Sequence, residues 1–493
     1  MADATQWGRK ELGLLGGSLL AGILFDFLFY GKELGVSYPL FVLAIYGLLC
    51  WQLRQYGKLQ VTFEWLLTVP IALLSLTFFW YSNGLFHFLN FLLVPFLFVV
   101  QSFLVAKRNK RDWYKIGFVA EVLELVFYYT IKHVRIPFSF VKNWIKANTD
   151  KRKYGVAIKV LIGLGISLPL LLVVLSLLSE ADSVFGYFLS EIPRMLFDLE
   201  IMEVSFRGIL IGVVSIGTFA YLWSLLAPRE ESVEIPNPVP QEEKQRWDGI
   251  ILVTILVVIN LVYAAFTIIQ ISYLFSGAQT VLPDDMTYAE YARKGFNELV
   301  MVTIINFLIL LMFMHLTSKE QPRVYRMVQI LLSLLTVCTG FMLFSAYFRL
   351  SLYEEAYGYT VSRLLAHAFM LFLLVLFGIA LVKIWREGIS LIKNYALTGI
   401  AAYLLLNYIN IDAIIAKNNI SRYEETGKID ADYLTHLSYD AVPYLVPLLE
   451  DRGVAEIIKY GLDEMREEMD DDDSWQSFNW SKYRAKQLLD SNR

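Results

Sequence analysis

The chain is 493 residues long; 56% of its residues are hydrophobic and only 18% are charged. A soluble globular protein carries about 25% charged residues, so this chain has too little polar material to cover a water-facing surface, and the bilayer is expected to be its main solvent. The formal net charge of −4 gives no indication of nucleic-acid binding, which requires a concentrated basic face, and we expect no nucleic-acid partner.

Runs of about 20 residues with few charges predict an all-α, polytopic membrane helix bundle with about eleven spans. The candidate spans are 12–30, 36–53, 61–81, 85–106, 156–179, 206–226, 249–273, 299–317, 326–348, 363–384 and 395–411. The first run is followed by "FDFLFYGKEL" instead of a small-residue cleavage site, so we expect a retained helix rather than a signal peptide.

The segment 227–248, "APREESVEIPNPVPQEEKQRWD", combines prolines with mixed charge and is expected to be a cytoplasmic linker. It divides a first membrane half of six spans (1–226) from a second of five spans (249–411). The remaining residues, 412–493, predict a small helical domain outside the membrane. In that domain we expect Gly427 to end one helix, Asp430 or Asp432 to cap the next, and Asp440 to cap a third.

Lysine and arginine are several-fold more frequent in alternate connections, which predicts a cytoplasmic N-terminus. An odd number of spans then places the C-terminal tail outside. Within 107–155, the segment 113–146 alternates aromatic and basic residues and is expected to lie as amphipathic helices on the inner leaflet. The alternative is a twelfth span at 116–134, which would reverse the sidedness of everything after it.

Motifs for phosphate-binding loops, zinc proteases, serine hydrolases and redox cysteines are missing from the sequence. The two cysteines lie in apolar runs, and the five histidines show no metal-ligand spacing. We therefore expect no cofactor and no metal. Ionisable residues near the middles of the spans are scarce, which weakens the case for ion-coupled transport.

The stretch "LLLNYINIDAIIAKNNISRY", 404–423, introduces polar residues where the chain leaves the membrane. On one continuous helix, Asn407, Asn410 and Asn418 would share a narrow stripe. An unpaired amide in an apolar medium costs roughly 2–7 kcal/mol, so the stripe should face protein or a wet crevice. Asp412 is expected to meet an arginine or to close the following turn. The end of this span should dock the tail against the connections 275–298 and 349–362.

Polar and aromatic residues gather in four segments that the predicted topology places on the outer side: 179–207, 282–299, 347–363 and 423–445. Tyrosine and arginine at such a boundary commonly anchor helices, but four clusters on one face also suggest a binding surface. The candidate ligand-binding residues are Asn407, Asn410, Asp412, Arg293, Arg349, Tyr353 and Arg363.

Four stretches also carry a family resemblance: "SLPLLLVVLSLLSEADSVF", "YAEYARKGF", "LYEEAYGYTVSR" and "NIDAIIAKNNISRY…IDADYLTHLSYDAVPYL". They resemble, in the same order, motifs of an uncharacterised bacterial membrane protein family, the domain of unknown function 4173, which has 4153 as a relative. The similarity runs from about residue 60 to the end of the chain. It implies a polytopic protein of the bacterial cytoplasmic membrane and carries no catalytic residue over.

Three functions remain open on the sequence. The first is the binding or translocation of an envelope lipid or amphiphile at the outer face, where arginines suit phosphate groups. The second is a regulatory or assembly role with other membrane proteins. The third is a membrane-embedded, envelope-modifying enzyme that uses Asp284, Asp285, Asp412 or Asp440 as a base or metal ligand. The sequence leaves enzymatic activity undecided and leans against it, with membrane lipids as the expected partners.

Overall fold

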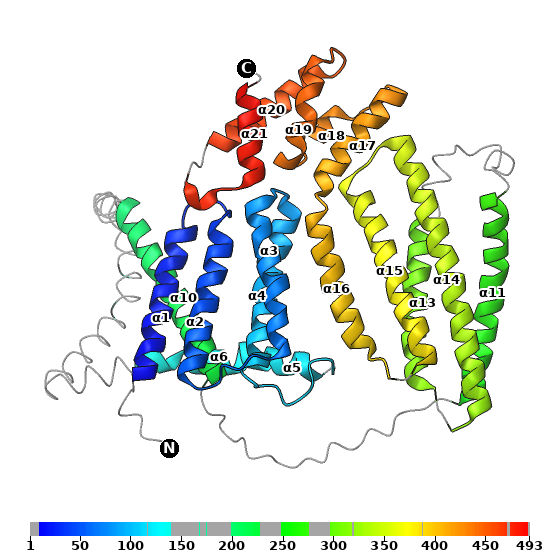
Figure 1. Ribbon diagram of the computed structural model, residues 1–493, viewed down its shortest axis with the longest axis horizontal. Helices are drawn as coiled ribbons and strands as arrows, with labels where there is room; N and C mark the ends of the chain where they lie inside the picture. The colour runs from blue at the N-terminus through cyan, green and yellow to red at the C-terminus, as the bar shows by residue number, and fades with distance from the viewer. Residues whose placement is uncertain are drawn as a thin grey trace, which may run out of the picture. The chain divides into compact units, whose positions relative to one another are not determined.

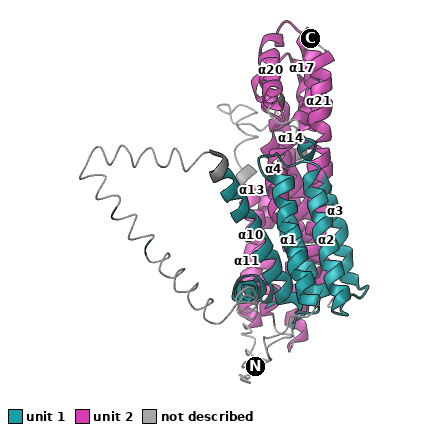
Figure 2. Cartoon of the chain, turned by 90° about the vertical axis from the view of Figure 1, so that its left-hand side faces the viewer, with its two compact units in different colours: residues 1–76, 93–229, 474–478 teal, residues 77–92, 230–473, 479–493 magenta. Residues whose placement is uncertain are grey.

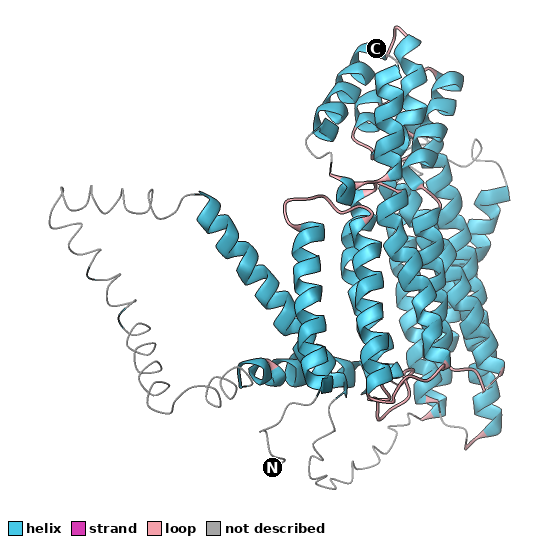
Figure 3. Cartoon of the chain, turned by 60° about the vertical axis from the view of Figure 1, so that its left-hand side comes forward, coloured by secondary structure: helices cyan, strands magenta, loops and turns pink. Residues whose placement is uncertain are grey.

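The computed structural model describes residues 9–115, 117–139, 167, 174, 199–226, 248–275, 296–317, 320–386, 388–470 and 474–491. Its secondary structure in these ranges is helical, with no strand (Figure 3). The predicted span 156–179 except residues 167 and 174, the linker up to residue 247, and most of the segments 179–207 and 282–299 lie outside the described residues.

Eight helical stretches of the described residues are long and apolar enough to cross a membrane. They are α1 (Arg9–Phe29), α3 (Thr68–Trp80) with the preceding turn η1 (Phe63–Leu67), α4 (Gly84–Val105), α10 (Leu199–Leu226), α11 (Gly249–Phe275), α13 (Phe296–Leu316), α14 (Pro322–Tyr357) and α15 (Val361–Trp385). The bent pair α16 (Leu391–Tyr408) and α17 (Ile411–Thr426) makes a ninth if it counts as one span. The prediction of a polytopic membrane helix bundle is confirmed.

One predicted span forms a helix that is not among these eight. Residues 36–53 correspond to α2 (Ser37–Gln55), whose last turns hold the polar residues Gln52, Arg54 and Gln55. The sequence predicts about eleven spans. The described residues contain eight or nine of them as long apolar helices and one more as α2, and the remaining span, 156–179, lies outside them except for residues 167 and 174.

The chain forms two compact units, coloured separately in Figure 2. Unit 1 comprises residues 1–76, 93–229 and 474–478, and unit 2 comprises 77–92, 230–473 and 479–493. The predicted halves 1–226 and 249–411 and the tail 412–493 stay a prediction.

In unit 1, α1 packs closely on α10. A Cβ at Gly22 would lie 2.6 Å from the carbonyl oxygen of Ile211, so only glycine permits this approach. Asp26 of α1 forms an ion pair with Arg207 of α10 at 2.7 Å. Leu14, Leu49 and Phe219 belong to the shared apolar core of α1, α2 and α10.

The segment expected on the inner leaflet forms α5 (Gly117–Leu123), the π-helical turn η2 (Glu124–Tyr129) and α6 (Thr130–His133). In Figure 1 these elements run across the ends of α1 and α2 within unit 1. Phe118 and Val122 are buried in the unit 1 core, whereas Val119 and Phe127 are exposed. The described part of this segment thus has one face on protein and one face free, and its contact with a leaflet stays a prediction.

In unit 2, α11, α13, α14 and α15 share an apolar core. A second, smaller core joins α17 to the helices that follow it: α18 (Ala431–Thr435), η3 (Tyr439–Ala441), α19 (Val442–Leu445), η4 (Val446–Glu450), α20 (Ala455–Asp470) and α21 (Trp480–Ser491). The short turn η5 (Trp475–Ser477) belongs to unit 1. The expected helical C-terminal region is present.

The predicted helix ends in this region can be compared one by one. Gly427 ends α17 with φ of 68°, as expected. Asp430 caps α18 by accepting a hydrogen bond from the backbone N–H of Tyr433 at 3.1 Å. The prediction for Asp440 was wrong, because this residue lies inside the turn η3 and caps no helix.

Candidate functional site

The stretch 404–423 does not form one continuous helix. α16 ends at Tyr408, α17 begins at Ile411, and the two helices are bent by 55°. Asn410 lies at the break with φ of 54°, in the left-handed region that asparagine tolerates better than most residues. Its side-chain oxygen accepts a hydrogen bond from the N–H of Ala413 at 3.2 Å and so caps α17.

The predicted amide stripe was therefore wrong. Asn418 lies on α17, which points in a different direction from α16, and it is only half-buried. The neighbouring Asn419 is the buried amide of this helix. Asn407, Asn410 and Asn419 consequently serve three separate contacts instead of one stripe.

Asn407 faces the protein, as expected. Its oxygen accepts a hydrogen bond from the amide of Asn90 at 2.7 Å, and its own amide donates to the carbonyl of Tyr403 at 2.9 Å. The amide of Asn90 also donates to the hydroxyl of Thr77, and its oxygen accepts from the Tyr403 hydroxyl at 2.7 Å. The buried amides of Asn90 and Asn407 thus satisfy each other between α4 and α16.

Two aspartates are buried beside the break. Asp412, 2% exposed, follows it on α17, and Asp440, 8% exposed, lies on η3. The hydroxyl of Ser438 lies within hydrogen-bond reach of Oδ2 of both carboxylates, so its single proton serves one of them at a time. We refer to Asp412, Ser438 and Asp440 as the aspartate cluster.

The backbone N–H of Ser438 also donates to Asp412, at 3.4 Å, and described residues 82, 83 and 410 donate from outside the aspartate cluster. The Asn83 amide donates to Asp412 at 2.8 Å, and the Asn410 amide donates to Asp440 at 3.2 Å. The N–H and hydroxyl of Ser82 donate to Asp440 at 2.8 and 3.0 Å. The side-chain oxygen of Asn83 accepts a hydrogen bond from the N–H of Phe86, and the side-chain oxygen of Asn410 accepts one from the N–H of Ala413. Because the oxygen of each amide is held in this way, its NH₂ group must point to the aspartate cluster.

Neither aspartate forms an ion pair with another described residue. Because Arg293 lies outside these residues, the expectation that Asp412 meets an arginine or closes the following turn stays a prediction. Oδ1 of Asp412 is buried without a hydrogen-bond partner among the described residues. A cavity of about 10 Å³, measured for the centre of a water-sized sphere, lies beside Asn83, Asn407, Asn410 and Asp440. That volume suits one water molecule and is too small for a lipid headgroup. The cluster therefore holds the chain segments together and offers no room for a large ligand.

Three of the other predicted site residues lie elsewhere in unit 2. Arg349 donates to the side-chain oxygen of Gln270 at 3.3 Å. The guanidinium of Arg363 lies 4.3 Å from the ring centroid of Tyr353 and donates to the carbonyl of Gly358. Arg293, like Asp284 and Asp285, lies outside the described residues. The six described candidates thus fall into separate sets of contacts, and the place of Arg293 stays a prediction.

The C-terminal helices dock on the connection between α14 and α15, as expected. The Asn419 side chain accepts from the N–H of Tyr359 at 2.9 Å and donates to its carbonyl at 2.8 Å. Gly358 is required there, because it has φ of 86° and a Cβ would lie 2.5 Å from the Asn419 oxygen. The N–H of Val361 donates to the hydroxyl of Tyr433, whose pKa is raised by burial. Most of the other expected contact, 275–298, lies outside the described residues.

Two features of unit 2 were missed by the sequence reasoning. One is a buried pair formed by Glu354 of α14 and His367 of α15. It could have been found by treating "LYEEAYGYTVSR" as the turn of a helical hairpin, since residues a few positions before and after such a turn meet. The other is an apolar groove of about 420 Å³ between α15 and α16, for which the sequence gives no local signal.

A comparison with models of protein families finds a family that matches most of the chain. The model of the domain of unknown function DUF4153 matches residues 68–448. The chain belongs to the DUF4153 family. The narrower assignment to the family 4173 stays a prediction. No curated protein and no solved structure matches the chain. The DUF4153 region contains the helix break, the aspartate cluster, the Glu354–His367 pair and the groove.

Proposed function

We propose that this DUF4153 protein binds the acyl chain of a membrane lipid or amphiphile in the groove between α15 and α16. The observation that carries the proposal is the groove itself, whose volume of about 420 Å³ falls in the size range of ligand pockets. Its lining is mostly apolar and comprises Leu365, Ala368, Phe369, Leu371, Phe372, Val375, Thr398, Gly399, Ala402, Tyr403, Leu405, Leu406 and Ile409.

The position of the groove along α15 suits one lipid tail. The stretch from Leu365 to Val375 is about 15 Å long at about 1.5 Å per residue. This is half of the roughly 30 Å thickness of a bilayer's hydrocarbon core. The groove therefore matches a single leaflet, the one nearer the C-terminal helices, and with the predicted orientation this is the outer leaflet. A one-leaflet groove favours binding over translocation across the whole bilayer.

Polar residues lie at the same end of the two helices. Arg363 precedes Leu365 by two residues on α15, and Asn410 follows Ile409 at the end of α16. A lipid whose tail fills the groove would thus have its headgroup at the level of the Arg363 guanidinium, which is suited to phosphate. Bacterial envelope lipids are expected to supply both an acyl chain for the groove and an anionic headgroup for the arginine.

The test fills the groove without disturbing the fold. A Cβ at Gly399 would meet no atom within 4 Å, so Gly399→Leu places its side chain into open space in the groove. Gly378 of α15 has the same open surroundings but does not line the groove, so Gly378→Leu is the matched control. The full-length protein is reconstituted with phosphatidylglycerol that carries a photoreactive acyl chain, and the crosslinked peptides are mapped by mass spectrometry.

We expect crosslinks to concentrate between Leu365 and Val375 in the parent protein and in Gly378→Leu, and to fall strongly in Gly399→Leu. Each buried methylene of a lipid chain contributes about 0.8 kcal/mol, so excluding a few of them is enough to empty the groove. Crosslinks spread evenly over the lipid-facing helices, or unchanged by Gly399→Leu, would contradict the proposal.

A further inference from the structure

Glu354 and His367 are two ionisable side chains buried between membrane-spanning helices. Oε2 of Glu354 on α14 and Nε2 of His367 on α15 are 2.9 Å apart. The residues are 3% and 8% exposed, respectively. Ionisable groups in such places are costly and are typically functional, with the partner as part of the function.

The pair is incompletely hydrogen-bonded. Oε1 of Glu354 and Nδ1 of His367 are both buried, and neither has a hydrogen-bond partner among the described residues. The imidazole ring therefore has one nitrogen bonded to the carboxylate and a second nitrogen that can accept a proton without losing an existing bond. A purely structural pair would be expected to have these atoms paired.

The charged and titratable groups nearest the pair come from α14, α15 and the connection between them. The Tyr347 ring of α14 lies edge-on to His367, with 4.3 Å between the ring centroids. Arg363, one turn before His367, lies over Tyr353. Tyr359 in the connection is hydrogen-bonded through its backbone to Asn419.

Two further charged groups come from α17 and α13. Arg422 of α17 donates to the backbone carbonyls of Glu355 and Ala356, and Glu298 of α13 is exposed. Glu354 has no ion pair among the described residues other than the one with His367, so the charge of the pair is set by its own protons.

We propose that Glu354 and His367 form an exchangeable proton site. With one proton between Nε2 and Oε2, the carboxylate is ionised, the imidazole is neutral and the pair carries a net charge of about −1. A hydronium ion then transfers a proton to Nδ1 and becomes water, which converts the imidazole to imidazolium and leaves the Nε2–H···Oε2 hydrogen bond in place. The pair becomes neutral overall, which is favourable where a net charge is removed from water.

This site goes beyond lipid binding and does not depend on it. The pair lies near the ends of α14 and α15 that meet at their connection, and not at the middles of the spans. It also lies on α15, the helix that forms one wall of the groove.

The test is infrared difference spectroscopy of the full-length protein in nanodiscs, recorded between acidic and neutral pH, with isotope-labelled histidine to mark the imidazole bands. We expect one imidazolium band that disappears in His367→Asn. In Glu354→Gln the imidazolium band should form only at a proton concentration about tenfold higher or more, because the neighbouring negative charge is lost. Glu355→Gln is the matched control, since Glu355 is the adjacent but exposed carboxylate, and it should leave the band and its midpoint unchanged.

The proposal is overturned if the acid-minus-neutral spectrum of the parent protein equals that of His367→Asn, or if Glu354→Gln and Glu355→Gln have the same midpoint. His367→Gln provides a second variant where His367→Asn fails to fold, and a thermal melt of each sample checks this. The measurement uses no lipid probe, so its outcome is separate from that of the groove experiment.

Discussion

At the scale of single residues, the clearest polar contact inside the bundle is the amide pair Asn90–Asn407. Its two members are 317 residues apart in the chain. Because Asn407 is a polar residue in an apolar run, the sequence predicts that it faces protein. No pattern in the sequence could identify Asn90 as its partner, because contacts between distant helices leave no local periodicity. The same holds for Ser82 and Asn83, which reach the aspartate cluster from another part of the chain.

Asn407→Leu should destabilise the protein, because the Asn90 amide and the Tyr403 hydroxyl network would lose a partner inside the bundle. An unsatisfied buried polar group costs about 1–3 kcal/mol, and interhelical hydrogen bonds in membranes average about 0.6 kcal/mol. We expect a lower melting temperature by intrinsic fluorescence in detergent. Asn418→Leu, a half-buried amide on α17, is the control and should change the melting temperature little. Equal melting temperatures for the two variants would refute the structural role of Asn407.

At the scale of elements, the helix break at Asn410 separates what sequence patterns could predict from what they could not. Apolar runs of sufficient length predicted the spans, and Gly427 and Asp430 marked ends that the structure confirms. The break was missed because apolar residues continue across it, which favours an unbroken helix. The capping signal was nevertheless present, as Asn410 is followed by Asp412 in the first turn of α17.

Two substitutions at Asn410 distinguish the backbone requirement from the cap. Asn410→Gly keeps the left-handed conformation but loses the contacts with Ala413 and Asp440. Asn410→Ala loses the same contacts and also disfavours the left-handed conformation, so it should be about 1 kcal/mol more destabilising than Asn410→Gly. Thermal melts of both variants measure this difference. A glycine variant that melts at or below the alanine variant would show that the left-handed conformation is not the controlling feature.

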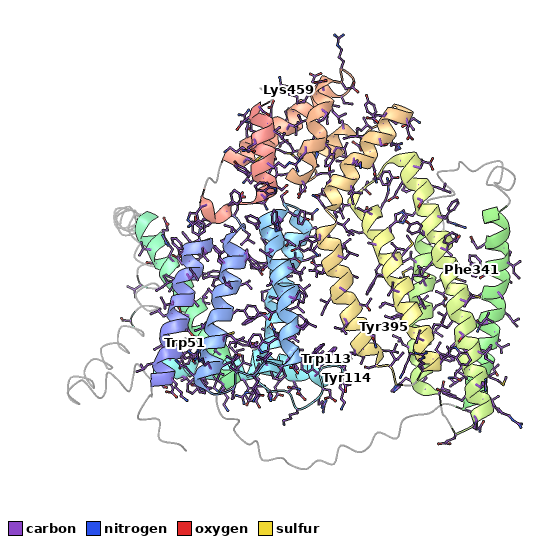
Figure 4. All side chains as sticks on the ribbon, viewed as in Figure 1. Trp51, Trp113, Tyr114, Phe341, Tyr395 and Lys459 are labelled. Carbon is purple, nitrogen blue, oxygen red and sulfur yellow. The ribbon has the colours of Figure 1, made fainter. Side chains whose placement is uncertain are left out.

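At the scale of the whole molecule, sidedness stays the main prediction from charge. Within unit 2, the connection between α15 and α16 and the helix α20 lie at opposite ends of the helices; Tyr395 and Lys459 mark these two regions in Figure 4. Tyr460 on α20 is 75% exposed, and a Cβ at Gly388 in the connection would meet no atom within 4 Å. Both positions therefore accept a cysteine.

In a background without Cys50 and Cys338, Tyr460→Cys should react with an impermeant thiol reagent in intact cells, and Gly388→Cys should react only after the membrane is opened. The reason is the excess of lysine and arginine in the connections predicted to be cytoplasmic. The reverse labelling pattern would invert the orientation and would move the groove to the inner leaflet.

The long separation between Asn90 and Asn407 also has a consequence for biosynthesis. Ribosomes add about 5–20 residues per second, so α4 is made roughly 15 to 60 seconds before the residue that pairs with its buried amide. Ser82 and Asn83 wait still longer for Asp440 and Asp412. During this interval the nascent chain exposes unpaired polar groups in or near the membrane, which requires shielding by the insertion machinery or by a membrane chaperone. Chains that terminate before α16 lack the partner altogether and should be preferred substrates of membrane proteases.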